Sequence, residues 1–168
     1  KLTPRITETA KGLWAVYFAM TFVCIVSFRL AGMTWLDALI HAFSTMGLGG
    51  FSSHDASFGY WDSPAIEAVT IVFMLAASLN FATHFLAVRR RSLRPYARDA
   101  EAGMVMLAML GSVLMIALFL WWTATYPNFW TALRYSAFNV VSIASTTGFA
   151  NTDFALWPIF APLWMLYL

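Results

Sequence analysis

The residue types that could bind an ion through the backbone alone occur in two short segments, Gly47-Leu48-Gly49-Gly50-Phe51 and Ser145-Thr146-Thr147-Gly148-Phe149. Glycine adopts positive φ at little cost, so a chain that contains it can turn successive carbonyl oxygens to one side. Such oxygens can replace the hydration shell of a monovalent cation without a charged side chain that would retain it. We expect positive φ at Gly49, Gly50 and Gly148. The hydroxyls of Thr146 and Thr147 could add ligands or brace the second turn from behind.

Each of these turns follows a short, partly apolar segment with the composition of a helix. The segments cover residues 35–45 and 129–145. A helix well short of about 20 residues can enter a bilayer but cannot cross it, and its backbone survives there only against protein or water. We therefore expect two re-entrant helices. The C-terminal end of each carries about half a negative elementary charge, which favours a cation at the turn.

The composition places the rest of the chain in a membrane. Hydrophobic residues make up 61% and charged residues 11% of the sequence, against roughly 45–50% and about 25% in soluble domains. This balance excludes a water-soluble globule, and a net charge of +2 is too small to indicate a nucleic-acid partner. Spanning helices are expected over residues 13–30, 64–88 and 102–122, with a fourth from near Phe154. The fourth breaks off at residue 168 inside an apolar run, so we expect a fragment of a longer protein.

Basic residues give the expected orientation. Residues 89–101, between the second and third expected spans, form a short loop with five arginines. By the positive-inside rule this loop is cytoplasmic, and the basic residues within 1–11 place the start of the chain on the same side. Two spans separate these segments, so the two assignments agree. The segments that contain the glycine turns then face outward.

The two halves of the chain repeat one pattern. The pairs at an offset of 98 residues are Gly50 and Gly148, Asp55 and Asp153, and Pro64 and Pro162. Upstream, Ala42-Phe43 matches Ala137-Phe138 at an offset of 95, which indicates about three extra residues in the second short helix or its turn. We expect an all-α integral membrane protein with tandem parallel repeats of membrane helix, re-entrant pore helix, filter loop and membrane helix. The first unit covers residues 1–95 and the second, truncated, covers residues 96–168.

Several of these residues also have plain structural interpretations. Either glycine turn alone fits a hairpin or a close helix contact, and only the matching pair favours an ion site. Asp55 and Asp153 either concentrate cations at an outer mouth or cap helices. The three histidines lie in different elements, so a histidine metal site is not expected. Cys24 lies in an apolar run and is expected to be a buried core thiol.

The two turns, read as Gly47-Leu48-Gly49-Gly50-Phe51-Ser52 and Ser145-Thr146-Thr147-Gly148-Phe149, resemble the filter loops of the TrkH, KtrB and HKT superfamily of potassium transporters. Residues 41–55, with their Gly-Phe-x-x-x-Asp pattern, look closest to TrkH, and the resemblance covers nearly the whole chain. It implies four span-loop-span units around one pore, of which this chain supplies the second and third. It implies filter support by Phe51 and Phe149. The implied potassium-binding residues are Leu48, Gly49, Gly50, Thr146, Thr147 and Gly148.

The same resemblance implies a function and partners. The function is potassium uptake through a selective pore in the bacterial cytoplasmic (inner) membrane, with potassium as the transported ion, no organic cofactor and no enzyme activity. The implied partners are membrane lipid, a second copy in a homodimer and a cytoplasmic nucleotide-binding regulatory subunit of the TrkA type. The alternative from another class is a non-transporting membrane scaffold or membrane enzyme with re-entrant loops.

Cysteine labelling can check the expected orientation. In a Cys24→Ala background of the full-length protein, Ser57→Cys should react with a membrane-impermeant maleimide added from outside. Ser92→Cys should react only from inside, because the neighbouring arginines hold their loop in the cytoplasm. Labelling of position 57 only from inside would overturn the whole arrangement.

Overall fold

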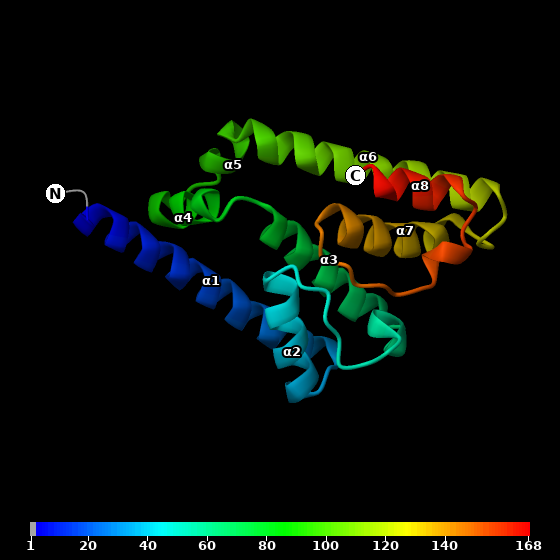
Figure 1. The fold of residues 1–168 in the computed structure, drawn as a ribbon, viewed down its shortest axis with the longest axis horizontal. Helices are drawn as coiled ribbons and strands as arrows, with labels where there is room; N and C mark the ends of the chain where they lie inside the picture. Colours follow the sequence, from blue (N-terminus) through cyan, green and yellow to red (C-terminus); the bar gives the residue numbers. More distant parts are fainter. Residues whose placement is uncertain (1–2) are drawn as a thin grey trace.

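The computed structural model of the protein describes the backbone of residues 3–168 and the side chains from Thr7 onward. Within that range the chain is helical and contains no β-strand, as expected for an all-α fold (Figure 1). The elements are α1 (Thr3–Ala31), α2 (Trp35–Met46), η1 (Ser57–Tyr60), α3 (Pro64–Ser78), α4 (Phe81–Arg90), α5 (Arg94–Arg98), α6 (Ala100–Trp122), α7 (Phe129–Ala144), η2 (Phe154–Leu156) and α8 (Phe160–Leu166).

Two helices are long and apolar enough to cross a membrane. They are the stretch Thr7–Ala31 of α1, with 25 residues, and α6, with 23 residues. Both exceed the length of about 20 residues that a span requires. These helices contain the spans expected over residues 13–30 and 102–122.

The second expected span is not the one unbroken helix that was predicted, although α3 and α4 together are long and apolar enough to cross a membrane. Residues 64–88 fall in α3 and α4, which are bent by 94° at a short break. Leu79 is extended, with ψ of 155°, and cannot continue α3. Asn80 then caps α4, because its Oδ1 accepts from the N–H of Ala82 at 2.9 Å. Local hydrogen bonding therefore ends the helix within a segment whose apolar composition favours one span.

Polar side chains fasten the chain around this bend. The ring of His84 donates from Nε2 to the carbonyl of Ala76 at 2.8 Å, and its Nδ1 lies 2.6 Å from the hydroxyl of Tyr96 on α5. Thr83 donates to Asp99 at 2.8 Å. This bond, together with backbone donors at the start of α6, holds the pKa of Asp99 below its ordinary value. Thr83 and His84 of α4 thus contact protein.

The basic end of α4 lies beside the start of α1. Arg89 and Phe85 line a surface pocket together with Glu8 and Thr9, so the two basic segments occupy the same end of the molecule (Figure 1). The side of the membrane that this end faces stays a prediction. Residues 89–101 were expected to form a simple loop, but they include the short helix α5, with Pro95 in its first turn. The proposed unit boundary at residue 95 falls inside this helix.

The two short helices expected from the sequence are present. α2 has 12 residues and α7 has 16, so neither can span a bilayer. Thr34 caps α2 by accepting from the N–H of Asp37 at 3.1 Å, and Asn128 caps α7 by accepting from the N–H of Thr131 at 2.8 Å. α2 packs against α1 and α3, and α7 packs against α6 and α3, so α3 contacts both short helices (Figure 1).

The last helix begins later than expected. Residues from Phe154 form only the 3-10 turn η2, the extended Trp157 interrupts the helical path, and α8 starts at Phe160.

The core lies where the two halves meet. There the ring centroids of Phe58 and Phe149 are 4.6 Å apart, and both side chains are buried. Cys24 is 0% exposed, which confirms the expected core thiol.

Candidate ion-binding site

The two glycine turns have equivalent backbone hydrogen bonds. In each turn, N–H groups that follow the short helix donate back to carbonyls of its last turns. The bonds are Gly47 to Phe43 (2.9 Å), Leu48 to Thr45 (3.1 Å) and Gly49 to Ser44 (2.8 Å) in the first turn, and Ser145 to Val141, Thr146 to Ile143 and Thr147 to Ser142 (2.9 Å each) in the second. Every donor and every acceptor lies 98 residues from its counterpart.

The offset of 98 therefore continues into the helices, and the offset of 95 inferred upstream was wrong. The structural equivalent of Phe43 is Val141, not Phe138. α2 and α7 end 98 residues apart, at Met46 and Ala144, whereas their first residues are 94 apart. The additional residues thus lengthen the N-terminal end of α7 and leave the turn unchanged.

The turns also share their pattern of positive φ. The values are 50° at Leu48 and 67° at Gly50, and 62° at Thr146 and 88° at Gly148. Gly49, which we expected to have positive φ, is not among these residues. The two non-glycine residues occupy the left-handed region instead, at a cost of about 1 kcal/mol or more each. Such strain persists only where the surrounding structure fixes the conformation.

The two turns meet backbone to backbone at Gly50. A Cβ on Gly50 would collide with the carbonyl oxygen of Thr147 and would lie 3.2 Å from the carbonyl carbon of Gly148. Gly50 is therefore needed both for its φ and for the close approach of the second turn. A Cβ on Gly148 would meet no described atom within 4 Å, so the equivalent face of the second turn is open.

Within the described part of the chain, the carbonyl oxygens of the turns have no hydrogen-bond donor. Among residues 3–168, no backbone hydrogen bond ends on a carbonyl of residues 48–50 or 146–148. The N–H groups of residues 47–49 and 145–148, in contrast, are paired with the helices. A backbone carbonyl in a membrane protein needs a polar partner. A water molecule or a cation can serve.

Hydroxyl groups hold the second turn from behind. Ser142 donates to the carbonyl of Phe149 at 2.6 Å, and the hydroxyls of Ser145 and Thr147 are 2.7 Å apart. Thr147 is buried, whereas Thr146 is exposed. The hydroxyl of Thr147 is thus a brace within the turn, and the side chain of Thr146 is free of the packed core.

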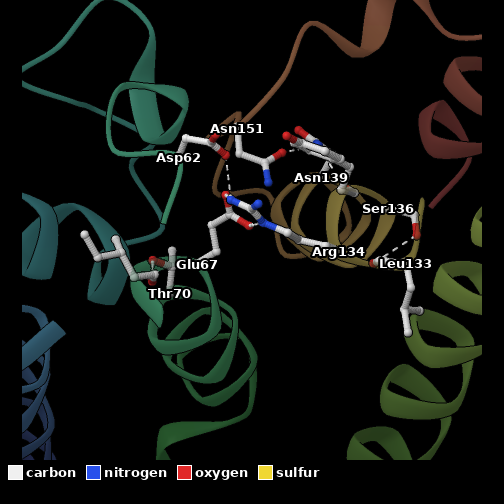
Figure 2. Close-up of polar contacts among 10 residues, drawn as sticks. Asp62, Glu67, Thr70, Leu133, Arg134, Ser136, Asn139 and Asn151 are labelled. Atoms are coloured by element: carbon white, nitrogen blue, oxygen red, sulfur yellow. Dashed lines mark hydrogen bonds and ion pairs between the residues drawn. The ribbon is translucent and has the colours of Figure 1, made fainter. Parts of the chain in front are cut away.

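A pair of polar residues that the sequence did not single out fastens each short helix to the chain beyond its turn. His41 on α2 lies 2.9 Å from the hydroxyl of Ser52, and Asn139 on α7 donates to Asn151 at 2.6 Å (Figure 2). The ring of His41 also donates from Nδ1 to the carbonyl of Asp37 at 2.8 Å, so in the neutral ring Nε2 accepts from Ser52. His41 and Asn139 are 98 residues apart, so the repeat offset was the signal that could have found them.

The two phenylalanines after the turns differ. Phe149 is buried against Phe58, and its role as a filter support stays a prediction. Phe51 is 77% exposed, so the expected wedge of this side chain against neighbouring helices is absent from the described part of the chain. Leu48 is partly buried against the core.

The two outer acids also differ in role. Asp153 caps η2 by accepting from the N–H of Ala155 at 3.1 Å, so the capping interpretation fits this residue. Asp55 is exposed, and the N-cap position of η1 belongs to Ala56, which offers no side-chain cap. Asp55 therefore caps no helix among the described residues, and the outer-mouth role of either acid stays a prediction.

These features define a class: an all-helical integral membrane protein in which two short helices end in matching turns that touch each other. The sequence profile of TrkH, described as a cation transport protein, matches residues 1–167. The chain belongs to the TrkH family. It spans about a third of the length of the relatives that it matches.

The similarity to individual relatives extends over nearly the whole chain. The chain is 49% identical over 158 residues to the Trk system potassium uptake protein TrkH of Halomonas elongata. The aligned region covers 94% of this chain and 33% of that protein. It is 43% identical over 166 residues to the protein of the same name in Salmonella typhimurium, which covers 99% and 34%. The crystal structure of the potassium transporter TrkH from Vibrio parahaemolyticus matches with a TM-score of 0.93 at 43% identity, over 98% of this chain and 36% of that one.

Neutralising the outer acids separates charge from capping. Asn caps helices about as well as Asp, so Asp55→Asn with Asp153→Asn removes charge but keeps the cap. We expect cation uptake at low external potassium to fall by up to about fivefold, because exposed charges interact through water at about 1 kcal/mol or less. The loss should shrink at high ionic strength. Uptake kinetics equal to wild type at low salt would show that these charges do not concentrate cations.

Proposed function

We propose that this chain supplies two of four filter loops to a pore for selective potassium uptake across the bacterial cytoplasmic membrane. The observation that carries the proposal is the contact of two equivalent turns whose carbonyl oxygens lack donors. The names of the relatives, potassium uptake protein and potassium transporter, support potassium as the ion. Under this proposal the ion is the transported substrate, and its ligands are carbonyls of Leu48, Gly49 and Gly50 with those of Thr146, Thr147 and Gly148.

Backbone ligands suit the task because permeation needs binding that is strong enough to replace water and weak enough to release the ion. The turns meet this condition with neutral dipoles alone. The alternating positive φ in each turn orients carbonyls that the helices leave unpaired. The C-terminal ends of α2 and α7 add a favourable partial charge for a cation.

The open face of Gly148 supports the proposal of a further unit beside the second turn. Gly50 is closed off by the following turn, and Gly148 occupies the equivalent position without such a neighbour. We infer that residues 1–95 and 96–168 are the second and third of four units, and that the fourth unit covers Gly148 as the third covers Gly50. A homodimer, surrounding lipid and a cytoplasmic nucleotide-binding subunit of the TrkA type complete the proposed assembly, with no organic cofactor.

Serine substitution of the turn glycines tests the proposal. Gly148→Ser adds no steric collision with a described atom but places a side chain at positive φ, at about 1–2 kcal/mol of strain. If the carbonyl it carries is an ion ligand, the preference for rubidium over sodium should fall about tenfold, which corresponds to about 1.4 kcal/mol. Gly50→Ser should lose at least as much, because its Cβ also displaces the carbonyl of Thr147. The measurement is rubidium uptake by full-length protein in vesicles, with sodium as competitor.

Gly103→Ser is the matched control. Gly103 is exposed on α6, and a Cβ added there would meet no described atom within 4 Å, so rubidium preference should stay at the wild-type value. If Gly148→Ser and Gly50→Ser fold and keep wild-type preference, these turns do not bind the ion. The scaffold alternative then becomes the better explanation.

A further inference from the structure

A partly buried ion pair joins the two units. Arg134 of α7 donates from Nε to Oε2 of Glu67 at 2.8 Å and from Nη2 to Oε1 of Glu67 at 2.8 Å. The same Nη2 donates to Oδ1 of Asp62 at 2.7 Å. Figure 2 shows the guanidinium of α7 between Glu67, at the start of α3, and Asp62, in the loop before it. Two acids of the first unit thus share one cation of the second.

The burial of the three partners differs. The side chain of Glu67 is 3% exposed, that of Arg134 is 26% exposed and that of Asp62 is 70% exposed. A charge as buried as that of Glu67 is stable only with a partner. Arginine is suited to this role because its planar fork fixes direction as well as distance. The pair therefore constrains the orientation of α7 relative to α3.

Each end of this ion pair lies on a segment that connects to one of the turns. Arg134 is on α7, which ends at Ala144 immediately before the second turn. Asp62 and Glu67 lie on either side of Pro64, where the segment that follows the first turn becomes α3. Asp62 itself has φ of 40°, a left-handed conformation that costs energy in a residue other than glycine. The residue with this strained backbone is thus the one whose carboxylate accepts from Arg134.

Between the ion pair and the turns, the two units touch through backbone groups. The N–H of Phe58 donates to the carbonyl of Ala150 at 2.9 Å, and Gly50 adjoins Thr147 at the turns. These contacts are short-ranged and follow the spacing that the helices impose. The guanidinium of Arg134 adds a link between charged side chains, with three hydrogen bonds to two acids.

We infer that Arg134 is a positioning residue for ion selection: through Glu67 and Asp62 it holds the two turns at the spacing that their carbonyls need. This inference rests on the proposed function. It assigns the choice between potassium and sodium partly to a residue that does not contact the ion. An alternative role for the cluster, attraction of cations by its net negative charge, would depend on ionic strength, whereas positioning would not.

The experiment compares variants of the full-length protein in vesicles, with rubidium uptake and sodium competition measured at low and high ionic strength. The double variant Arg134→Gln with Glu67→Gln removes both charges and leaves an amide pair that can still hydrogen-bond, so no charge is left buried and alone. We expect its preference for rubidium over sodium to fall about fivefold or more at both ionic strengths, with total cation uptake retained. Arg134→Lys, which keeps the charge but lacks the fork, should give an intermediate loss.

Two further variants complete the test. Arg98→Gln makes the same chemical change at an exposed position on α5 and should keep wild-type preference. Asp62→Asn leaves the pair of Arg134 and Glu67 intact, should fold because its side chain is largely exposed, and should lower the preference by about twofold. It therefore gives a result even if the double variant does not fold.

The outcomes separate the inference from the function on which it rests. Wild-type protein without preference for rubidium would overturn both. Selective wild-type protein with unchanged preference in Asp62→Asn, Arg134→Lys and any folded double variant would overturn the inference alone. A loss of uptake that appears only at low ionic strength, with preference intact, would assign the cluster to cation attraction and would also overturn positioning.

Discussion

The approach of two backbone turns at Gly50 is the contact on which the arrangement depends. A single added Cβ would occupy the place of the Thr147 carbonyl oxygen, so the two turns can approach this closely only because Gly50 has no side chain. The elements on either side are fitted to this contact. α2 and α7 stop short of crossing the membrane, α3 packs against both, and the rings of Phe58 and Phe149 fill the space behind.

The hydrogen bonds around the turns divide the polar groups of the backbone into two sets. The N–H groups point back into the short helices and are paired there, while the carbonyls of residues 48–50 and 146–148 are left for another partner. In a membrane this division has a direct chemical consequence, because unpaired carbonyls are tolerated only where they meet water, an ion or other protein. The left-handed φ of the strained residues Leu48 and Thr146 contributes to this separation of paired N–H groups from unpaired carbonyls.

The sequence was sufficient for the features that depend on local composition. Apolar length indicated α1 and α6, short partly apolar segments indicated α2 and α7, and the offset of 98 identified equivalent positions in the turns. It was insufficient where a few hydrogen bonds override composition, as at Leu79 and Asn80, where an apolar segment bends by 94°. It was also insufficient for partners distant in the chain. Arg134 and Glu67 are 67 residues apart, and no local pattern relates them.

The two turns differ in their side chains but share their backbone conformation. Leu48 and Thr146 differ in polarity, and Gly49 and Thr147 differ in size, yet their backbone conformations and hydrogen bonds correspond. The braces differ as well, with a histidine in the first unit and an asparagine in the second. A site built from side chains could not tolerate such changes, whereas a site built from carbonyls can, because its ligands do not depend on residue type. The repeat therefore constrains conformation more strongly than sequence, which agrees with our proposal that the backbone binds the ion.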